Sequence, residues 1–202
     1  MNSTIGVVVG TYGDRLEWSR IAQRAIRSIH AQTRKPDDWI HVHGGSLADA
    51  RNKGAEILGT DQLIFLDADD ELDSRYVEAM MFNAELSSNR WTIWRPSTIG
   101  VYPDGSTDES AVMIPASDLK RRNCIVIGAM CPADAFFEVG GFSEDPVLED
   151  WDLWIRCVRS GVAISETPQA IYRVFVNPNG RNQVDPALHG RVYSEILRRY
   201  LW

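Results

Sequence analysis

Residues 63–70 read Leu-Ile-Phe-Leu-Asp-Ala-Asp-Asp, so that four apolar residues run directly into a group of acids. A short continuous apolar run is typical of a strand buried on both faces, as in a parallel sheet covered by helices. Because open α/β sheets bind ligands beyond the carboxyl ends of such strands, we expect Asp67, Ala68 and Asp69 to border a ligand site. Carboxylates bind hard divalent cations, which usually complete their coordination with water and substrate phosphates. The stretch therefore predicts a phosphate-bearing substrate presented on a metal ion.

Two other interpretations of the same acids remain open. Acids at positions 67, 69, 71, 73 and 78 match the ligand spacing of an EF-hand calcium loop. However, Leu72 stands where that loop needs glycine, and a strand rather than a helix comes before it. In the other interpretation, the acids form a solvated loop that caps the next helix.

The composition bounds the class of protein. A chain of 202 residues forms one domain or two small lobes that share a core. The net charge of −7 argues against general nucleic-acid binding, although a metal could neutralise the phosphates of a nucleotide. No apolar run approaches the roughly 20 residues that span a bilayer, and the first residues lack a signal-peptide pattern. The three cysteines have no metal-binding spacing and cannot all pair, so we expect a cytoplasmic protein.

The first half of the chain alternates strands and helices. Strands are expected at 4–9, 39–42 and 63–66. Helices are expected after the turn at 10–14, ending before Pro36; after Ser46, with Asp49 completing a capping box; and from Asp73 or Ser74 onward. This order is typical of a parallel, right-handed α/β half, which we expect to end near Asn89.

The second half has a different pattern. Strands are expected at 91–94, 111–114, 124–129 and 170–176. Helices are expected at about 132–139, from Glu149 to just before Gly161, and from Asp185 into the C-terminal region, where the cap is followed by Pro186.

Three blocks of sequence carry a resemblance to a known family. The first is Val-Val-Val-Gly-Thr-Tyr at 7–12. The second is Ala-Arg-Asn-Lys-Gly at 50–54 together with the D-x-D stretch at 65–70. The third is Gly-Gly-Phe at 140–142 together with Glu-Asp-Trp-Asp-Leu-Trp at 149–154. In this order and at this spacing, the chain resembles the family 2 glycosyltransferases of the GT-A fold, from Gly6 to about Asn177.

The resemblance implies a fold and an activity. The fold would be α/β of the GT-A type, with a Rossmann-like, mostly parallel sheet flanked by helices and a smaller acceptor-side half. Residues 1–89 would form the nucleotide-sugar-binding half and residues 90–202 the acceptor-binding and catalytic half of a single domain. The activity would be transfer of a sugar, with inversion, from a nucleoside-diphosphate donor for which a UDP-linked sugar is expected. Family members often use Mn²⁺ or Mg²⁺.

Site residues follow from the same blocks. Asp150 would be the general base, and Glu149, Trp151 and Gly128 would lie on the acceptor side. Acids at a helix N-terminus can also merely complement the helix dipole, which is the alternative interpretation of Glu149 and Asp150. Asp69 would bind the cation, with Asp67 sharing it or reaching the ribose. The remaining donor-binding candidates are Thr11, Tyr12, Asp14 and Arg51.

The sequence departs from the family pattern at two places. The second strand ends in His43-Gly44-Gly45-Ser46 instead of an acid that recognises the base, so the donor's base stays open and His43 becomes a candidate contact. Phe175 stands near the position of the family's metal-binding histidine, which leaves His189 as a candidate ligand. Arg173 and Arg181 are alternative clamps for the diphosphate.

Two further functions compete with glycosyl transfer. A sugar nucleotidyltransferase would want a glycine-rich phosphate loop with a basic residue, which residues 10–15 match only weakly. A non-catalytic nucleotide- or carbohydrate-binding module would not need the acids at 67, 69 and 150. The sequence predicts neither the acceptor nor the oligomeric state.

Overall fold

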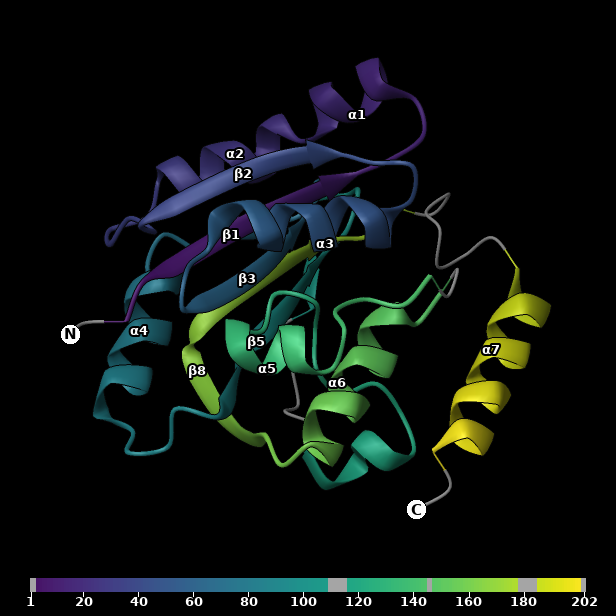
Figure 1. The fold of residues 1–202 in the computed structure, drawn as a ribbon. Coiled ribbons are helices and arrows are strands. Elements are labelled where there is room, and N and C mark those ends of the chain that lie inside the picture. The colour runs from purple at the N-terminus through teal and green to yellow at the C-terminus, as the bar shows by residue number, and fades with distance from the viewer. Residues whose placement is uncertain (1–2, 109–115, 145–146, 178–184, 201–202) are drawn as a thin grey trace.

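The computed structural model describes residues 3–108, 116–144, 147–177 and 185–200. Two four-stranded sheets form its frame (Figure 1). The first has the order β2-β1-β3-β7, where β1 (Ile5–Thr11), β2 (Asp38–His43) and β3 (Gln62–Asp67) are parallel and β7 (Cys131–Pro132) is antiparallel. The second has the order β4-β8-β5-β6, built from β4 (Glu71–Leu72), β8 (Ala163–Phe175), β5 (Thr92–Val101) and β6 (Thr107–Asp108). This mixed α/β architecture confirms the predicted fold class.

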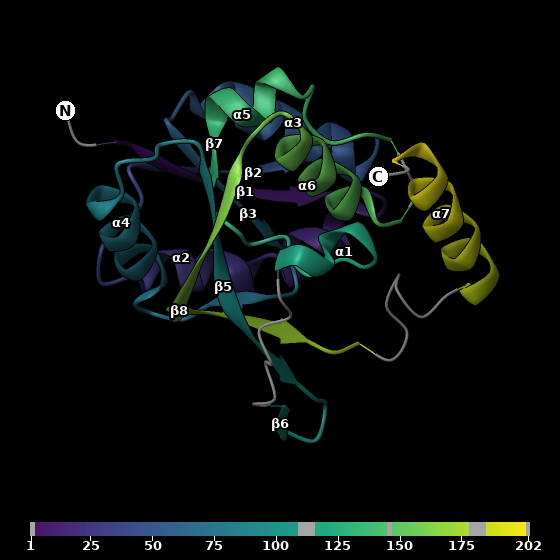
Figure 2. The ribbon, with the colours of Figure 1, turned by 90° about the horizontal axis from the view of Figure 1, so that it is seen from below.

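Helices cover both faces of the first sheet. Helix α3 (Leu47–Leu58) lies on one face, while α1 (Arg15–Ile21) and α2 (Gln23–His30) lie on the other (Figures 1 and 2). The other helices are α4 (Tyr76–Leu86), α5 (Ala133–Glu138), α6 (Glu149–Arg159) and α7 (Pro186–Arg199), with a 3-10 turn at Ala116–Lys120. None of the helices in the described part of the chain is long and apolar enough to cross a membrane.

The central strands are buried as their apolar runs predict. Every residue of β1 is buried, and so is β3 up to Leu66. Helix α3 approaches this layer closely because Gly54 has no side chain. A Cβ atom at Gly54 would lie only 2.4 Å from Cγ1 of Val8, so only glycine lets the helix backbone rest on β1. This contact fixes the position of the residues that α3 presents to the sheet edge.

The capping signals at Ser46 and Asp185 are confirmed, whereas the helix expected from Asp73 or Ser74 begins at Tyr76, with Arg75 as an N-cap that makes no side-chain hydrogen bond. The Ser46 hydroxyl accepts a hydrogen bond from the backbone N–H of Asp49 at the start of α3. Helix α3 ends at Gly59, whose φ of +58° is the left-handed conformation that glycine adopts without strain. Asp185 caps α7 by accepting from the N–H groups of Ala187 and Leu188.

Several expected elements differ from the structure. The helix expected after residue 14 is divided at Ala22 into α1 and α2. The strand expected at 124–129 is wrong, because side chains take up its backbone carbonyls. Arg95, Trp154 and Tyr76 donate to the carbonyls of residues 124, 125 and 128. The last strand begins at Ala163, earlier than expected, and the strand expected at 111–114 lies outside the described residues.

The division of the domain at residue 89 stays a prediction. Strand β4, which precedes that point, belongs to the second sheet, and β7, which follows it, belongs to the first. Each sheet therefore contains a short strand from the other side of the predicted boundary at residue 89.

Candidate functional site

Three parallel strands end together at one edge of the first sheet. The register pairs Thr11 with His43 and Gly10 with Asp67, so the carboxyl ends of β1, β2 and β3 lie side by side. The residues that follow these strands are consequently the ones that a ligand at this edge would meet.

An acidic group occupies the end of β3. Asp67, Asp69 and Asp70 each offer a carboxylate oxygen, and these oxygens lie within 4.8 Å of one another. Burial raises the pKa of Asp70 well above its usual value, and the charges of Asp67 and Asp69 add to the effect. A divalent cation would relieve this repulsion, and three carboxylates supply the hard oxygen ligands that Mg²⁺ or Mn²⁺ prefers. The donor set therefore fits the expected metal ion.

Strand β8 holds the acidic group in place. The backbone N–H of Phe175 donates to Oδ1 of Asp70 over 2.8 Å, and the N–H of Asp67 donates to the Tyr172 hydroxyl over 3.1 Å. Asp70 is not among the site residues predicted from the sequence, although it stands in the same acidic run. Its position depends on Phe175, which lies 105 residues away in the chain.

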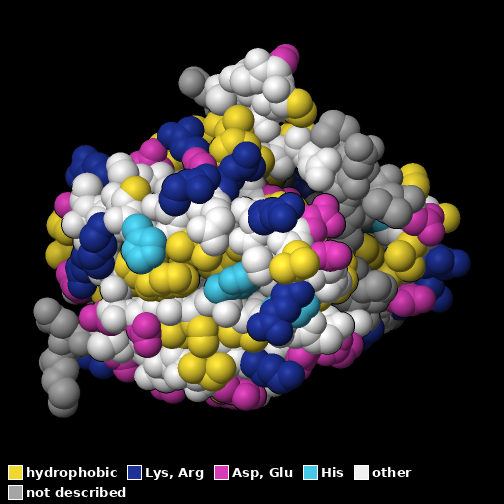
Figure 3. Space-filling view, turned by 90° about the horizontal axis from the view of Figure 1, so that it is seen from above, with side chains coloured by type: hydrophobic (Ala, Val, Ile, Leu, Met, Phe, Trp, Pro, Cys, Tyr) yellow, Lys and Arg dark blue, Asp and Glu magenta, His cyan; other side chains and the backbone are white. Residues whose placement is uncertain are grey.

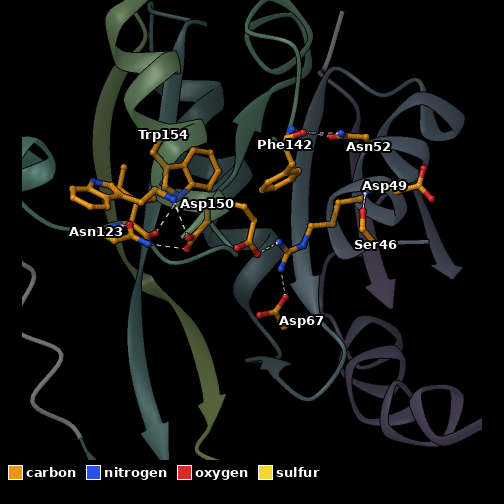
Figure 4. A network of polar contacts seen from close by, with 12 residues as sticks. Ser46, Asp49, Asn52, Asp67, Asn123, Phe142, Asp150 and Trp154 are labelled. Atoms are coloured by element: carbon orange, nitrogen blue, oxygen red, sulfur yellow. Dashed lines mark hydrogen bonds and ion pairs between the residues drawn. The ribbon is translucent and has the colours of Figure 1, made fainter. Parts of the chain in front are cut away.

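A buried arginine connects this group to the third sequence block, at Glu149. Arg51 on α3 donates to Oδ1 of Asp67 over 2.5 Å and to Oε1 of Glu149 over 2.8 Å. Arg51 is 2% exposed and Glu149 is 3% exposed. Figure 4 shows these ion pairs beginning at Asp67, with Asp150 and its contact to Asn123 beside them. The second and third sequence blocks thus meet at one guanidinium group.

The charge of Arg51 is strongly stabilised. Burial by itself lowers the pKa of an arginine, but the charges of Asp67 and Glu149 outweigh it and raise the pKa of Arg51 above its ordinary value. Removing the guanidinium would leave the buried Glu149 carboxylate without this partner, which is costly in a low-dielectric interior.

Asp150 lies next to this network at the start of α6. Its Oδ2 accepts a hydrogen bond from the Asn123 amide, and its Oδ1 accepts from the N–H of Trp151, both over 2.8 Å. Burial raises the pKa of Asp150 to about 6, helped by the charge of Glu149 and opposed by Arg51 and Asn123. A carboxylate with such a pKa is better matched to proton abstraction near neutral pH than an ordinary aspartate.

The Gly-Gly-Phe block is tied to α3 through Asn52. The amide of Asn52 donates to the backbone carbonyl of Phe142 and its Oδ1 accepts from the Phe142 N–H, both over 2.9 Å. A Cβ atom at Gly141 would lie 2.6 Å from the same Oδ1. The Asn52 amide therefore fits against the Gly-Gly-Phe block because Gly141 has no side chain.

A pair of histidines borders the strand ends. The Thr11 hydroxyl lies 2.9 Å from Nε2 of His41 and 3.1 Å from Nδ1 of His43. Burial lowers the pKa of His41, as do the nearby charges of His43 and Arg15. His41 was missed by the sequence analysis; its signal is the two-residue spacing from His43, which places both side chains on one face of β2.

A hollow of about 60 Å³ adjoins these strand ends. It is lined by Thr11, Tyr12, Leu47 and the end of β3 with Asp67, Ala68 and Asp69, among others. These predicted donor-binding residues are therefore gathered at one place.

Other predicted site residues have structural contacts. Asp14 caps α1 by accepting from the N–H of Glu17. The Trp151 ring is fully buried, stacks on Tyr193 and donates to the carbonyl of Leu119. Gly128 packs against Tyr172, where a Cβ atom would lie 2.2 Å from the ring.

The residues predicted to bind the diphosphate or to serve as a further metal ligand do not belong to the acidic group at the end of β3 in the described part of the chain. His189 is on α7, outside the acidic group at the end of β3. Arg173 forms an ion pair with Asp73 over 3.0 Å. Arg181 lies outside the described residues.

The fold is shared with a solved structure. The chain matches the crystal structure of S. aureus TarS, a GT-A-type glycosyltransferase, with a TM-score of 0.67 and 12% sequence identity. The match covers 98% of this chain and 43% of that chain, so this chain spans less than half the length of TarS. No protein-family model matches the sequence, and neither does any curated protein. The likeness identifies the fold as GT-A type.

Proposed function

We propose that the chain is an inverting glycosyltransferase that moves a sugar from a nucleoside-diphosphate donor to an acceptor hydroxyl. One observation carries the proposal. Arg51 pairs with Asp67 of the D-x-D stretch and with Glu149, the neighbour of Asp150. The acids suited to a metal-bound diphosphate are thereby linked to the residue that directly precedes the acid suited to proton abstraction. The GT-A fold shared with TarS supports the same activity.

The chemistry is a single displacement. Asp150 takes the proton of the acceptor hydroxyl while the oxygen of that hydroxyl forms a bond to the anomeric carbon of the sugar. The bond between that carbon and the diphosphate oxygen breaks, and the nucleoside diphosphate leaves with the electron pair. Attack from the face opposite the leaving group inverts the configuration at the anomeric carbon.

The acidic group at the end of β3 would hold a divalent cation, Mn²⁺ or Mg²⁺. When bound, the cation neutralises charge on the departing diphosphate. Asp67 and Asp69 are the proposed ligands, and Asp70, with Phe175 N–H on one oxygen, completes the group. Thr11, Tyr12 and His43 would contact the nucleotide, since they border the same strand ends.

We expect Asp69→Asn to abolish metal-dependent donor binding. The change removes one negative charge from a group whose oxygens lie within 4.8 Å of one another. A thermal-shift panel of nucleotides and nucleotide sugars, with and without Mn²⁺, measures the metal-dependent donor binding of the variant and of the wild type. Asp134→Asn on the exposed face of α5 is the matched control and should keep the metal-dependent shift. Unchanged donor affinity of the Asp69 variant in the presence of metal would exclude its role as a ligand.

The pH dependence of transfer follows from Asp150. Only the deprotonated carboxylate accepts a proton, so activity should be present above a pH of about 6 and be lost as the pH falls through that value. Below it, the rate should fall roughly tenfold for each pH unit, as expected for one essential base. Initial rates at saturating substrate, measured from pH 4.5 to 8.5, test this. A rate that stays constant down to pH 4.5 would rule out a base with this pKa.

The product distinguishes this function from nucleotidyl transfer. A glycosyltransferase releases free nucleoside diphosphate, whereas a sugar nucleotidyltransferase releases pyrophosphate. Chromatography of the products from a nucleotide sugar and a mixture of candidate acceptors separates the two reactions.

A further inference from the structure

A second hollow opens beside the acidic group. It has a volume of about 730 Å³ and lies between α1–α2 and the ends of β5 and β8. Its lining includes Asp69 and Tyr12, which also border the small hollow at the strand ends. Arg51, Glu149 and Asp150 do not line it. The hollow therefore adjoins the proposed cation site but not the proposed base.

Three arginines face this hollow from one side. Arg20, Arg24 and Arg27 are spaced by four and three residues, which places them on one face of the α1–α2 segment, and all three line the hollow. The guanidinium of Arg24 lies 3.8 Å from the ring centre of Phe175 and donates to the backbone carbonyl of Asp69 over 3.0 Å. One arginine of the row thus contacts the D-x-D stretch directly.

The other two arginines are available to a ligand. Arg20 and Arg27 are exposed, and neither forms an ion pair with any residue in the described part of the chain. In the view from above, Lys and Arg side chains gather beside the hairpin of β5 and β6 that projects at the top of the picture (Figure 3). This is a cationic patch on a chain whose net charge is −7.

The size and walls of the hollow indicate what it can hold. Pockets of about 300–1,000 Å³ accommodate ligands of nucleotide size. The small hollow at the strand ends has only about 60 Å³. Trp18 and Tyr102 add aromatic surface to the cationic wall. Arginine binds phosphate oxygens through paired N–H groups, and aromatic rings stack on planar ligand groups.

We propose that this hollow binds the phosphate groups of a ligand that extends from Asp69 along Arg24, Arg20 and Arg27. The inference rests on the proposed function for the cation site at Asp69. The phosphates belong either to the donor diphosphate or to a phosphate ester carried by the acceptor, and both present the same chemistry to the arginines.

The double variant Arg20→Ala/Arg27→Ala tests the proposal. Both side chains are exposed and alanine favours helix, so the fold should be retained, which circular dichroism checks. Binding of inorganic pyrophosphate and of UDP, with Mg²⁺ present, is measured by calorimetry. We expect pyrophosphate to bind the variant at least about tenfold more weakly, because two charged hydrogen-bond donors are lost. Arg75→Ala, which removes an exposed arginine paired with Glu78 on α4, should leave the affinity unchanged.

A second measurement assigns the source of the phosphate. Glycerol 3-phosphate is titrated into the wild-type protein with and without saturating UDP. Competition with UDP assigns the arginines to the donor diphosphate, and binding beside UDP assigns them to an acceptor phosphate. The proposal is overturned if these anions bind the double variant as tightly as the wild type, or bind neither.

The two proposals can fail separately. If the double variant binds pyrophosphate as tightly as the wild type while Asp69→Asn loses metal-dependent donor binding, the arginine site is wrong and the transferase proposal stands. If pyrophosphate binding depends on Arg20 and Arg27 but no nucleotide sugar is consumed, the phosphate site stands and the transferase is wrong.

Discussion

Replacing Asp150 with asparagine is expected to abolish transfer while donor binding and the fold are retained. Asparagine has nearly the same shape and can still accept the hydrogen bond from the N–H of Trp151. It cannot accept a proton, so the acceptor hydroxyl would have to attack without a base. General-base catalysis typically contributes about 100- to 10,000-fold to the rate, and we expect a loss in this range. Release of nucleoside diphosphate under saturating donor measures it.

Two controls separate a catalytic role of Asp150 from a structural one. Donor affinity in the thermal-shift panel should match the wild type, since Asp150 does not line the hollow at the strand ends. Asp134→Asn should transfer at the wild-type rate. Wild-type turnover by Asp150→Asn would mean that the base is another residue, and a lower unfolding temperature would point to a structural role in α6.

Replacing Arg51 with methionine should strongly destabilise the protein. Methionine replaces the unbranched part of the arginine side chain but carries no guanidinium group, so Glu149 would remain buried after losing its ion pair with Arg51. Breaking a buried ion pair by removing one partner costs about 3–5 kcal/mol. Arg51 also orients Asp67 at the proposed cation site, so the affinity for donor and metal should fall together with stability. The free energy of unfolding from urea titration is the measurement.

Lys53→Met is the matched control for Arg51→Met. Lys53 lies on the same helix and pairs with Asp49, but its side chain is 57% exposed. Exposed ion pairs contribute about 0–1 kcal/mol, so the control should remain near wild-type stability. Combining Arg51→Met with Glu149→Gln should recover part of the loss, because the buried negative charge that Arg51 pairs with is then removed. Equal stability of Arg51→Met and the wild type would show that the Asp67–Arg51–Glu149 network does not stabilise the fold.

Local patterns predicted the parts of the site that lie on single elements. The apolar run at 63–66 predicted the buried strand, and the acids behind it were predicted to meet a ligand, because strand ends in an open sheet share one edge. Ser46 and Asp185 predicted where α3 and α7 begin. Such signals can be recognised in the sequence because they depend on neighbours within a few residues along the chain.

Other signals were misleading because distant groups compete for the same backbone. Residues 124–129 have the apolar composition of a strand, yet three of their carbonyls accept hydrogen bonds from Arg95, Trp154 and Tyr76. Nothing within the segment reveals these donors. For the same reason Asn123 was not selected, although it donates to Asp150 from 27 residues away.

The sequence by itself determined the fold class, the positions of the central strands and the presence of the three blocks, since each depends on composition and spacing along the chain. Only the tertiary structure decided that Arg51 joins Asp67 to Glu149, because Glu149 lies 98 residues after Arg51 in the chain. The tertiary structure also decided that Arg20 and Arg27 face a hollow beside Asp69. The reason is that a buried charge needs partners on several sides at once. Those partners are set by how helices and sheets pack, and no periodicity within one segment records them.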